Sequence, residues 1–222
     1  MAEDRDAAVR ARRIEHLRFV REIRRLCAES SEAHVRLRRG AGKDIDQVPG
    51  MHEFIAHWLP EKRNRERDRA WYTVAALIAG QPRHVLRGRS DAEGDEGERT
   101  ATAYGISFGR TLAQAVIDSP AKERSRRGDN TRRRLALLVR QSPAGLHRYL
   151  PSATRLLRQY ETEPDWAQLL SDLTRWPWYA GDIGGRWQQD YFRTLHRDTW
   201  RKKDETDVAQ AVPDPGTSFG RA

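Results

Sequence analysis

The segment from Tyr104 to Arg140 reads YGISFGRTLAQAVIDSPAKERSRRGDNTRRRLALLVR and joins two distinct features. In its first part, Gly105 and Gly109 are four residues apart, so on a helix they would share one face. A face without side chains lets the backbone of another helix approach closely. The first part therefore predicts a helix that packs tightly against a second one.

The second part of the segment is strongly basic. Between residues 120 and 140, eight basic side chains are opposed by Glu123 and Asp129 alone, and eight minus two leaves a charge of +6. Unpaired charges are too costly to bury, and the block has too few acidic residues for a surface on which ion pairs balance the charge. It predicts contact with a polyanion, while a helix made soluble by its arginines is the alternative. The basic residues are Lys122, Arg124, Arg126, Arg127, Arg132, Arg133, Arg134 and Arg140.

The charge of the whole chain follows the same bias. Of the net +9 in 222 residues, residues 99–198 hold +7, because they contain 17 basic and 10 acidic side chains. Arginine greatly outnumbers lysine, which suits bidentate phosphate contact, although a GC-rich genome would produce the same composition. A hydrophobic content of 37% with seven tryptophans indicates a chain that folds around a core.

The single cysteine, Cys27, lies on the apolar stripe of the first helix, so it excludes a disulfide framework. No apolar run approaches the roughly 20 residues that span a bilayer, and the charged N-terminus lacks a secretory apolar region. We therefore expect a soluble protein of the cytoplasm, with no membrane contact.

Apolar residues recur at helical spacing along the chain, and no segment alternates with period two. The sequence predicts an all-α fold of two small helical bundles. The first bundle covers residues 1–98 and ends in an acidic, Gly-rich loop, and the second covers residues 99–198. Residues 199–222 lack periodicity and are expected to be disordered.

Capping residues and prolines mark the helices of the second bundle. Ser142, followed by a proline, predicts a helix start, and Pro151 should kink or restart that helix. Asp165 should cap the next helix and Pro177 should end it, so that a last helix starts at Asp182. Four aromatic residues on these apolar stripes are expected to pack in the core rather than stack on bases, namely Trp166, Trp176, Trp187 and Tyr191.

No constellation of residues predicts catalysis. The seven histidines form no ligand pair with a matching partner segment, and His52 and His57, which flank Glu53, are five residues apart, a poor spacing for one helix face. We expect surface or capping histidines. The glycines of residues 181–186 follow no strand, so they exclude a dinucleotide fingerprint. The sequence thus predicts no catalytic, metal or cofactor site.

Four landmarks give the chain a resemblance to CasB, the family of small subunits of the type I-E CRISPR surveillance complex Cascade. They are GISFGR at 105–110, RRRLALL at 132–138, DWAQLLSDL at 165–173 with Trp176, and RWQQDYF at 186–192. The resemblance covers roughly residues 100–195 and excludes the acidic loop and the tail. It implies a helical, non-catalytic subunit, present as a pair, that contacts the backbone and large subunits of the complex. It also implies contact with the guide RNA and with the target and displaced DNA strands, which stabilises the R-loop.

Candidate phosphate contacts come from two sources. By position, the resemblance implies contacts near Arg38 or Arg39, near Arg65 and at Arg148. Charge density in the sequence adds further arginines beside a glycine turn and in the basic block. These additions are Arg36, Arg110, Arg132, Arg133 and Arg134.

Two other classes of function remain open. A free-standing helical DNA-binding regulator would use a helix-turn-helix, for which Gly80 or Gly128 supplies the turn, and would read a defined operator. A pure protein-interaction subunit would place its arginines against acidic partners.

Overall fold

The computed structural model describes residues 2–90 and 104–211, and within these residues it is all-α, with no strand, as the sequence predicts. The α-helices are α1 (Ala2–Glu29), α2 (Ser31–Arg38), α3 (His52–Ile55), α4 (Arg65–Ile78), α5 (Arg83–Ser90), α7 (Phe108–Ile117), α8 (Ala121–Leu138), α9 (Pro143–Gln159) and α10 (Trp166–Ala211). Short 3-10 helices cover Ile45–Gln47, Pro49–Met51 and Ala56–Trp58.

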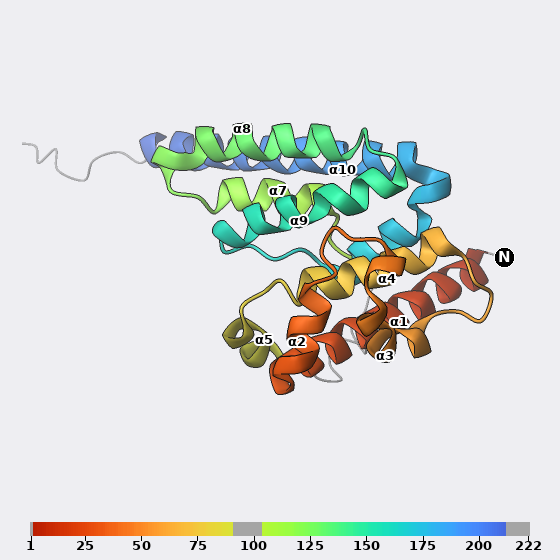
Figure 1. Ribbon diagram of the computed structural model, residues 1–222. Helices are drawn as coiled ribbons and strands as arrows, with labels where there is room; N and C mark the ends of the chain where they lie inside the picture. The colour runs from red at the N-terminus through yellow and green to blue at the C-terminus, as the bar shows by residue number, and fades with distance from the viewer. Residues whose placement is uncertain (1, 91–103, 212–222) are drawn as a thin grey trace, which may run out of the picture.

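The helices form two groups that lie against each other (Figure 1). Helices α1 to α5 make one group, and α7, α8, α9 and the second part of α10 make the other. The first part of α10 lies between them, since α10 packs on α1 and α4 as well as on α7. The predicted acidic loop, with the boundary at residue 98, lies outside the described residues.

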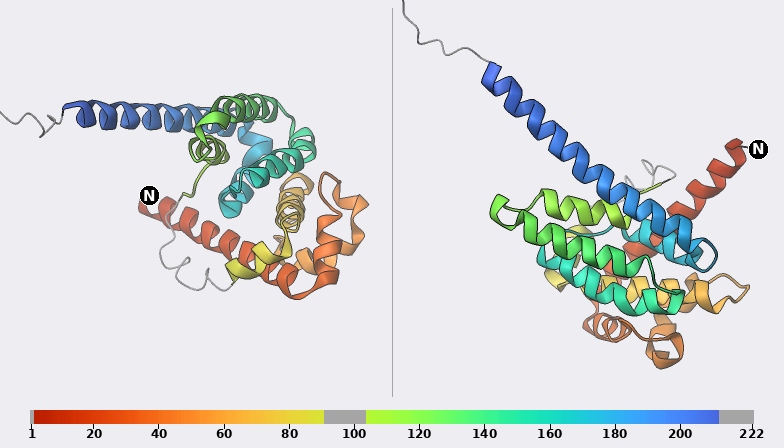
Figure 2. Two further views of the ribbon diagram at one scale, coloured as in Figure 1. Left: turned by 90° about the vertical axis from the view of Figure 1, so that its left-hand side faces the viewer. Right: turned by 90° about the horizontal axis from the view of Figure 1, so that it is seen from above.

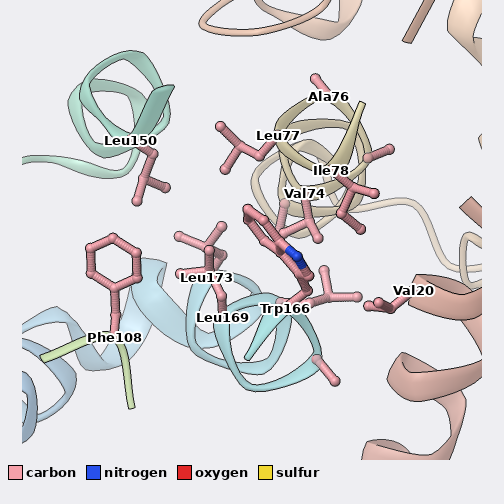
Figure 3. Packing of buried hydrophobic residues seen from close by; sticks show 14 of the residues in the cluster. Val20, Val74, Ala76, Leu77, Ile78, Phe108, Leu150, Trp166, Leu169 and Leu173 are labelled. Carbon is pink, nitrogen blue, oxygen red and sulfur yellow. The ribbon is translucent and has the colours of Figure 1, made fainter. Parts of the chain in front are cut away.

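A single cluster of buried apolar residues runs through both groups of helices. Trp166, at the start of α10, lies beside Val74 of α4 and close to Val20 of α1 (Figure 3). Trp166, Trp176, Trp187 and Tyr191 are all almost completely buried, which confirms the prediction that they pack in the core. Side chains of this size dominate the energetics of a core, so they tie the two groups together.

Two helix starts are set as predicted. Ser142 caps α9 by accepting a hydrogen bond from the Gly145 backbone N–H at 3.2 Å, and Asp165 caps α10 by accepting one from the Gln168 N–H at 2.9 Å. Pro151 lies inside α9, which continues through it without a restart.

The last helix differs from prediction at two places. It does not end at Pro177 but breaks at Tyr179, whose backbone angles (φ −131°, ψ 29°) are non-helical, and then continues. It also extends to Ala211, so residues 199–211, which the sequence analysis expected to be disordered, are helical. Residues 212–222 lie outside the described part.

The two glycines of the opening segment do not share a helix. Ser107 caps α7, so Gly105 precedes the helix and only Gly109 lies within it. Both nevertheless mark close approaches. A β-carbon at Gly105 would overlap the Asp165 carboxylate and would lie 2.6 Å from the Arg13 Cζ, and one at Gly109 would lie 2.8 Å from the Trp187 Cα.

Three histidines correct the expectation of a surface position. His16, His34 and His147 are buried, and His147 Nδ1 lies 2.8 Å from the Thr73 hydroxyl. Burial, with Arg12 next in effect, lowers the pKa of His16 to about 4, and burial, with Arg69 next, lowers that of His147 to about 3.

No helix in residues 2–90 and 104–211 combines the length and the apolarity that crossing a bilayer requires.

Candidate nucleic-acid interface

The turn after α2 brings two predicted arginine segments together. Gly42 has φ +76°, a left-handed conformation that favours glycine. A β-carbon there would lie 3.7 Å from the Arg148 carbonyl oxygen and 3.8 Å from the Pro151 Cγ, so the turn lies beside α9. Arg38 and Arg39, just before this turn, are therefore close to the segment of α9 that holds Arg148.

An open groove of about 240 Å³ lies between the two segments. Three arginines line it, Arg38 from α2 and Arg155 and Arg158 from α9. Arg158 donates a hydrogen bond to the Gly80 carbonyl, which ties α9 to the end of α4. The other residues that line the groove are Ala41, Ala76, Leu77, Gly80, Gln81, Pro151 and Thr154.

Arg155 and Arg158 were not among the predicted site residues. Arg155 follows Arg148 by seven residues, which is about two helical turns, so the two share one face of α9. This seven-residue spacing was the signal in the sequence that could have identified Arg155. This spacing places the two arginines on one face only if α9 runs unbroken through Pro151, where the sequence predicts a kink or a restart.

The basic helix α8 is joined to this region through Arg134. Its guanidinium donates a hydrogen bond to the Ser152 hydroxyl of α9 at 3.0 Å. Arg133 is exposed, and the neighbouring Arg132 forms an ion pair with Asp129 at 3.0 Å. Two of the three predicted arginines of α8 thus already have partners in this chain.

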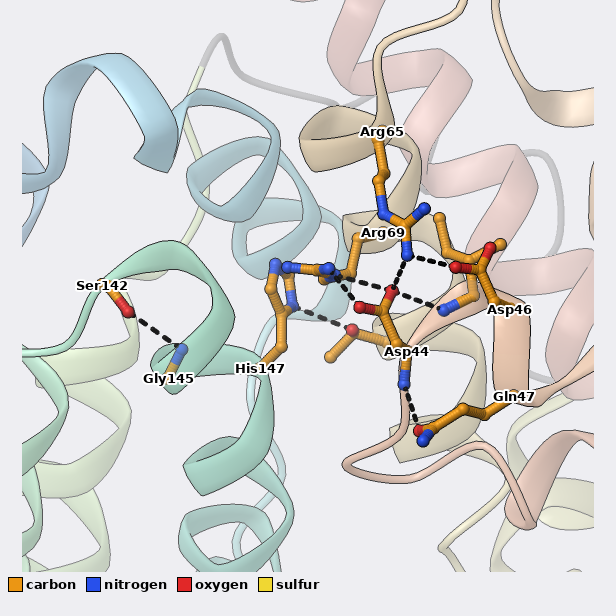
Figure 4. Close-up of polar contacts among 10 residues, drawn as sticks. Asp44, Asp46, Gln47, Arg65, Arg69, Ser142, Gly145 and His147 are labelled. Atoms are coloured by element: carbon orange, nitrogen blue, oxygen red, sulfur yellow. Dashed lines mark hydrogen bonds and ion pairs between the residues drawn. The ribbon is translucent and has the colours of Figure 1, made fainter.

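Arg36 and Arg65 are also engaged by acidic side chains. Arg36 pairs with Glu32 and, at 2.8 Å, with Glu53, and Arg65 pairs with Asp46 and, at 3.3 Å, with Asp44 (Figure 4). These pairs are substantially exposed, so each contributes little to stability. They nevertheless reduce the positive charge available at these positions.

Asp44 has a structural role at the base of the turn. It pairs with Arg69 at 2.5 Å and accepts a hydrogen bond from the Ile45 N–H at 2.7 Å. Burial opposes ionisation here, but Arg69 and these hydrogen bonds outweigh it and hold the pKa of Asp44 below its ordinary value. The contacts fix the 40–47 segment against α4, and the Thr73–His147 contact fixes α4 against α9.

The remaining predicted arginines and Arg155 have exposed side chains. Within the described residues, no carboxylate pairs with the exposed side chains of Arg38, Arg39, Arg110, Arg133, Arg148 or Arg155. Arg110 stands apart on α7, beside α10. Arg133 lies on α8. We call the arginines beside the turn and the groove the arginine face, comprising Arg38, Arg39, Arg148 and Arg155, together with the groove residue Arg158.

The two glycines considered for a helix-turn-helix do not provide an exposed recognition helix. Gly128 lies inside α8. Gly80 does separate α4 from α5, but α4 is almost wholly buried. In α5, Arg83 donates to the Cys27 and Ala28 carbonyls at the end of α1, and Arg87 donates to the Ala28 carbonyl, so these two side chains are turned toward α1.

The described residues contain no group of three or more His, Cys, Asp or Glu side chains that could hold a metal ion. An open pocket of about 430 Å³ beside α4 is lined by residues including His52, Asp68 and Tyr72. His52 Nδ1 lies 2.5 Å from the Tyr72 hydroxyl, so this ring already has a partner inside the pocket.

Comparison with known proteins gives consistent likenesses. The profile of the family described as CRISPR-associated protein Cse2 matches residues 33–192. A chain of a CRISPR RNA-guided surveillance complex is 31% identical, with a TM-score of 0.68 over 86% of this chain and 99% of that one. A chain of such a complex in a pre-nicking state is also 31% identical, with a TM-score of 0.70 over 85% and 98%.

CasB from M. ruber is 23% identical and has a TM-score of 0.60 over 83% of this chain and 96% of that one, which is a likeness of fold. No curated protein matches the chain.

Proposed function

The chain belongs to the CRISPR-associated Cse2 family, and from this premise we propose that it is a small, non-catalytic subunit of an RNA-guided surveillance complex of the Cascade type. Its partners are the backbone and large subunits of that complex and a second copy of itself. It binds the nucleic-acid backbone without sequence preference, and thereby stabilises the guide RNA with its target strand and the displaced DNA strand.

The observation that carries the nucleic-acid part of this proposal is the arginine face. Arg38 and Arg148 come from segments that are far apart in the sequence, lie beside one turn, and have no carboxylate partner among the described residues. Guanidinium groups without internal partners favour phosphate, which they can bind bidentately. Because each contact is to a phosphate rather than to a base edge, such a face positions the nucleic acid without reading its sequence.

The energetics of R-loop formation explain why modest contacts suffice. The heteroduplex that forms is about as stable as the DNA duplex that it replaces, so the exchange is nearly balanced. A subunit that adds a few phosphate contacts therefore shifts the equilibrium toward the open state without any chemical step. This role requires no metal, cofactor or nucleophile.

A salt titration tests the proposal. The purified chain is mixed with random-sequence single strands, with a random duplex and with a candidate operator, and affinity is measured from low to physiological salt. We expect binding without sequence preference, with a slope of log affinity against log salt of about −0.7 to −0.9 for each phosphate neutralised.

Preference for one duplex by about a thousandfold at physiological salt would favour a DNA-binding regulator instead. Absence of binding to every nucleic acid, with retention of binding to an acidic protein partner, would favour a pure protein-interaction subunit.

A further inference from the structure

The C-terminal part of α10 lies outside the arginine face. Figure 2 shows this end of the helix projecting beyond α7 and α8. The match to the family profile ends at residue 192, so the stretch from Phe192 to Lys202 begins at the last matched residue and otherwise lies beyond the match. No function was predicted for this stretch, and its last four residues, 199–202, belong to the tail that was expected to be disordered.

Two adjoining rows of side chains cover one exposed side of this stretch. Phe192, His196 and Trp200 recur every four residues, and so do Arg193 and Arg197, so each row runs along the helix and the two rows are neighbours. All five side chains are exposed, with Phe192 at 52% and Trp200 at 54%.

The opposite side of this part of α10 packs against the rest of the protein. Tyr191 is buried, and its hydroxyl lies 2.9 Å from the Thr131 hydroxyl of α8. Leu195 packs against the core cluster. The exposed side is therefore fixed in orientation by the packing of the opposite side, rather than free to rotate inward.

The aromatic rings are held in place by their neighbours. Phe192 contacts the Tyr191 ring edge to face, with centroids 5.2 Å apart. Trp200 donates its indole N–H to His196 Nε2 at 2.8 Å. The only polar atom of the indole thus has a partner, and the apolar ring remains exposed. A ring that is already oriented loses less conformational entropy when it binds a ligand.

The arginine row is positively charged and accessible. Within the described part of the chain, no carboxylate pairs with Arg193 or Arg197. Directly after Arg197, Asp198 pairs with Arg201 at 3.0 Å and with Lys202. The face thus presents free guanidinium groups next to exposed aromatic rings.

We propose that this face of α10, formed by Phe192, Arg193, His196, Arg197 and Trp200, binds single-stranded nucleic acid. The arginines contact phosphates, and the two large rings stack on unpaired bases. In a duplex the bases are already stacked on one another and cannot reach these rings. The inference rests on the proposed function, to which it adds a second contact that is separate from the arginine face.

Three variants of the full chain separate the two kinds of contact. The aromatic variant is Phe192→Ala with Trp200→Ala, and the charge variant is Arg193→Ala with Arg197→Ala. The matched control, Arg12→Ala with Lys62→Ala, removes the same charge at exposed positions on the other group of helices. Each is titrated with random single strands of DNA, single strands of RNA and a DNA duplex over a range of salt, after a melting curve has shown that it folds.

The aromatic variant should bind single strands about fivefold more weakly or worse, with an unchanged salt slope and unchanged duplex affinity. The charge variant should reduce the single-strand salt slope by about 1.4, because two phosphate contacts are lost. The control should bind as the wild type does. Comparing the affinities for single-stranded DNA and single-stranded RNA then shows which of the two nucleic acids is preferred.

The inference fails if the wild type binds single strands and both α10 variants bind them as tightly as the wild type does. It also fails if the aromatic variant retains single-strand affinity but loses self-association, in which case the face docks a second copy. If instead the wild type binds no nucleic acid at all, both the inference and the nucleic-acid part of the proposed function are wrong. If only the Arg38→Ala, Arg148→Ala variant loses binding, the result supports the arginine face and not the α10 face.

Discussion

The backbone of Gly109 in α7 packs directly against the backbone of Trp187 in α10. A β-carbon at position 109 would lie 2.8 Å from the Trp187 Cα and would overlap the Trp187 carbonyl. Next to it, the Phe108 and Trp187 rings are in contact, with centroids 5.3 Å apart. The second group of helices is therefore built around a contact that only glycine permits.

Gly109→Ala should destabilise the protein by about 1–3 kcal/mol, because the added methyl group pushes α7 away from α10. Thermal or urea unfolding measures this. The matched control is Gly128→Ala in α8, where the added carbon meets only Val116 at an ordinary 3.8 Å. That change should be neutral or stabilise by up to about 1 kcal/mol. Equal effects of the two changes would contradict the close contact.

Arg38→Ala with Arg148→Ala should weaken binding to random single strands and reduce the salt slope by about 1.4, since two phosphate contacts are lost. Arg36→Ala with Arg65→Ala removes the same charge from side chains that already pair with acidic residues. This second variant should change the slope much less. If both variants lose affinity equally, the net charge of the chain governs binding, and the partition into paired and free arginines has no functional meaning.

Asp172→Ala should destabilise the fold by about 2–5 kcal/mol. The buried carboxylate accepts hydrogen bonds from Gln168 at 2.8 Å and from the Trp187 indole at 2.6 Å, and it also pairs with Arg186. Its removal leaves these donors without partners in the core.

The control for this change is Asp129→Ala, which breaks the exposed pair with Arg132 and should cost less than about 1 kcal/mol. Chemical unfolding at neutral pH compares the two. A similar small loss in both variants would show that Asp172 contributes little.

The free energy of unfolding should fall as the pH drops from about 6.5 toward 4. In the folded state the pKa values of His16 and His147 are lowered to about 4 and about 3, against 6.5 for the free side chain. Over this window the unfolded chain therefore binds protons that the folded chain excludes, and stability declines. At pH 5 each histidine should account for about 2 kcal/mol.

His147→Gln tests this pH dependence, with His84→Gln, at an exposed position of α5, as the control. Urea unfolding at pH 7.5 and pH 5 gives the difference in stability for each protein. The difference should be smaller in His147→Gln than in the wild type, and unchanged in His84→Gln. A wild-type stability that stays constant between the two pH values would contradict the burial of neutral histidines.

Local sequence determined the class of fold and much of its core. Apolar spacing and capping residues depend only on neighbours within a turn or two of helix, so the all-α fold and the caps at Ser142 and Asp165 were predictable. The burial of Trp166 and Trp187 followed from their positions on apolar stripes. The same local pattern carried the family resemblance.

Tertiary structure decided which arginines are free. Arg65 is paired because a turn some 20 residues earlier places Asp44 and Asp46 beside it, whereas no carboxylate of the described residues pairs with Arg38. Charge density along the sequence cannot distinguish these cases, since an ion pair depends on distance in space.

The burial of His147 and the exposure of the α10 face are likewise set by how distant segments of the chain pack together. The sequence by itself thus determined the helices, whose stability depends on local spacing, whereas the packing of distant segments alone decided which charged and aromatic side chains remain available to a partner.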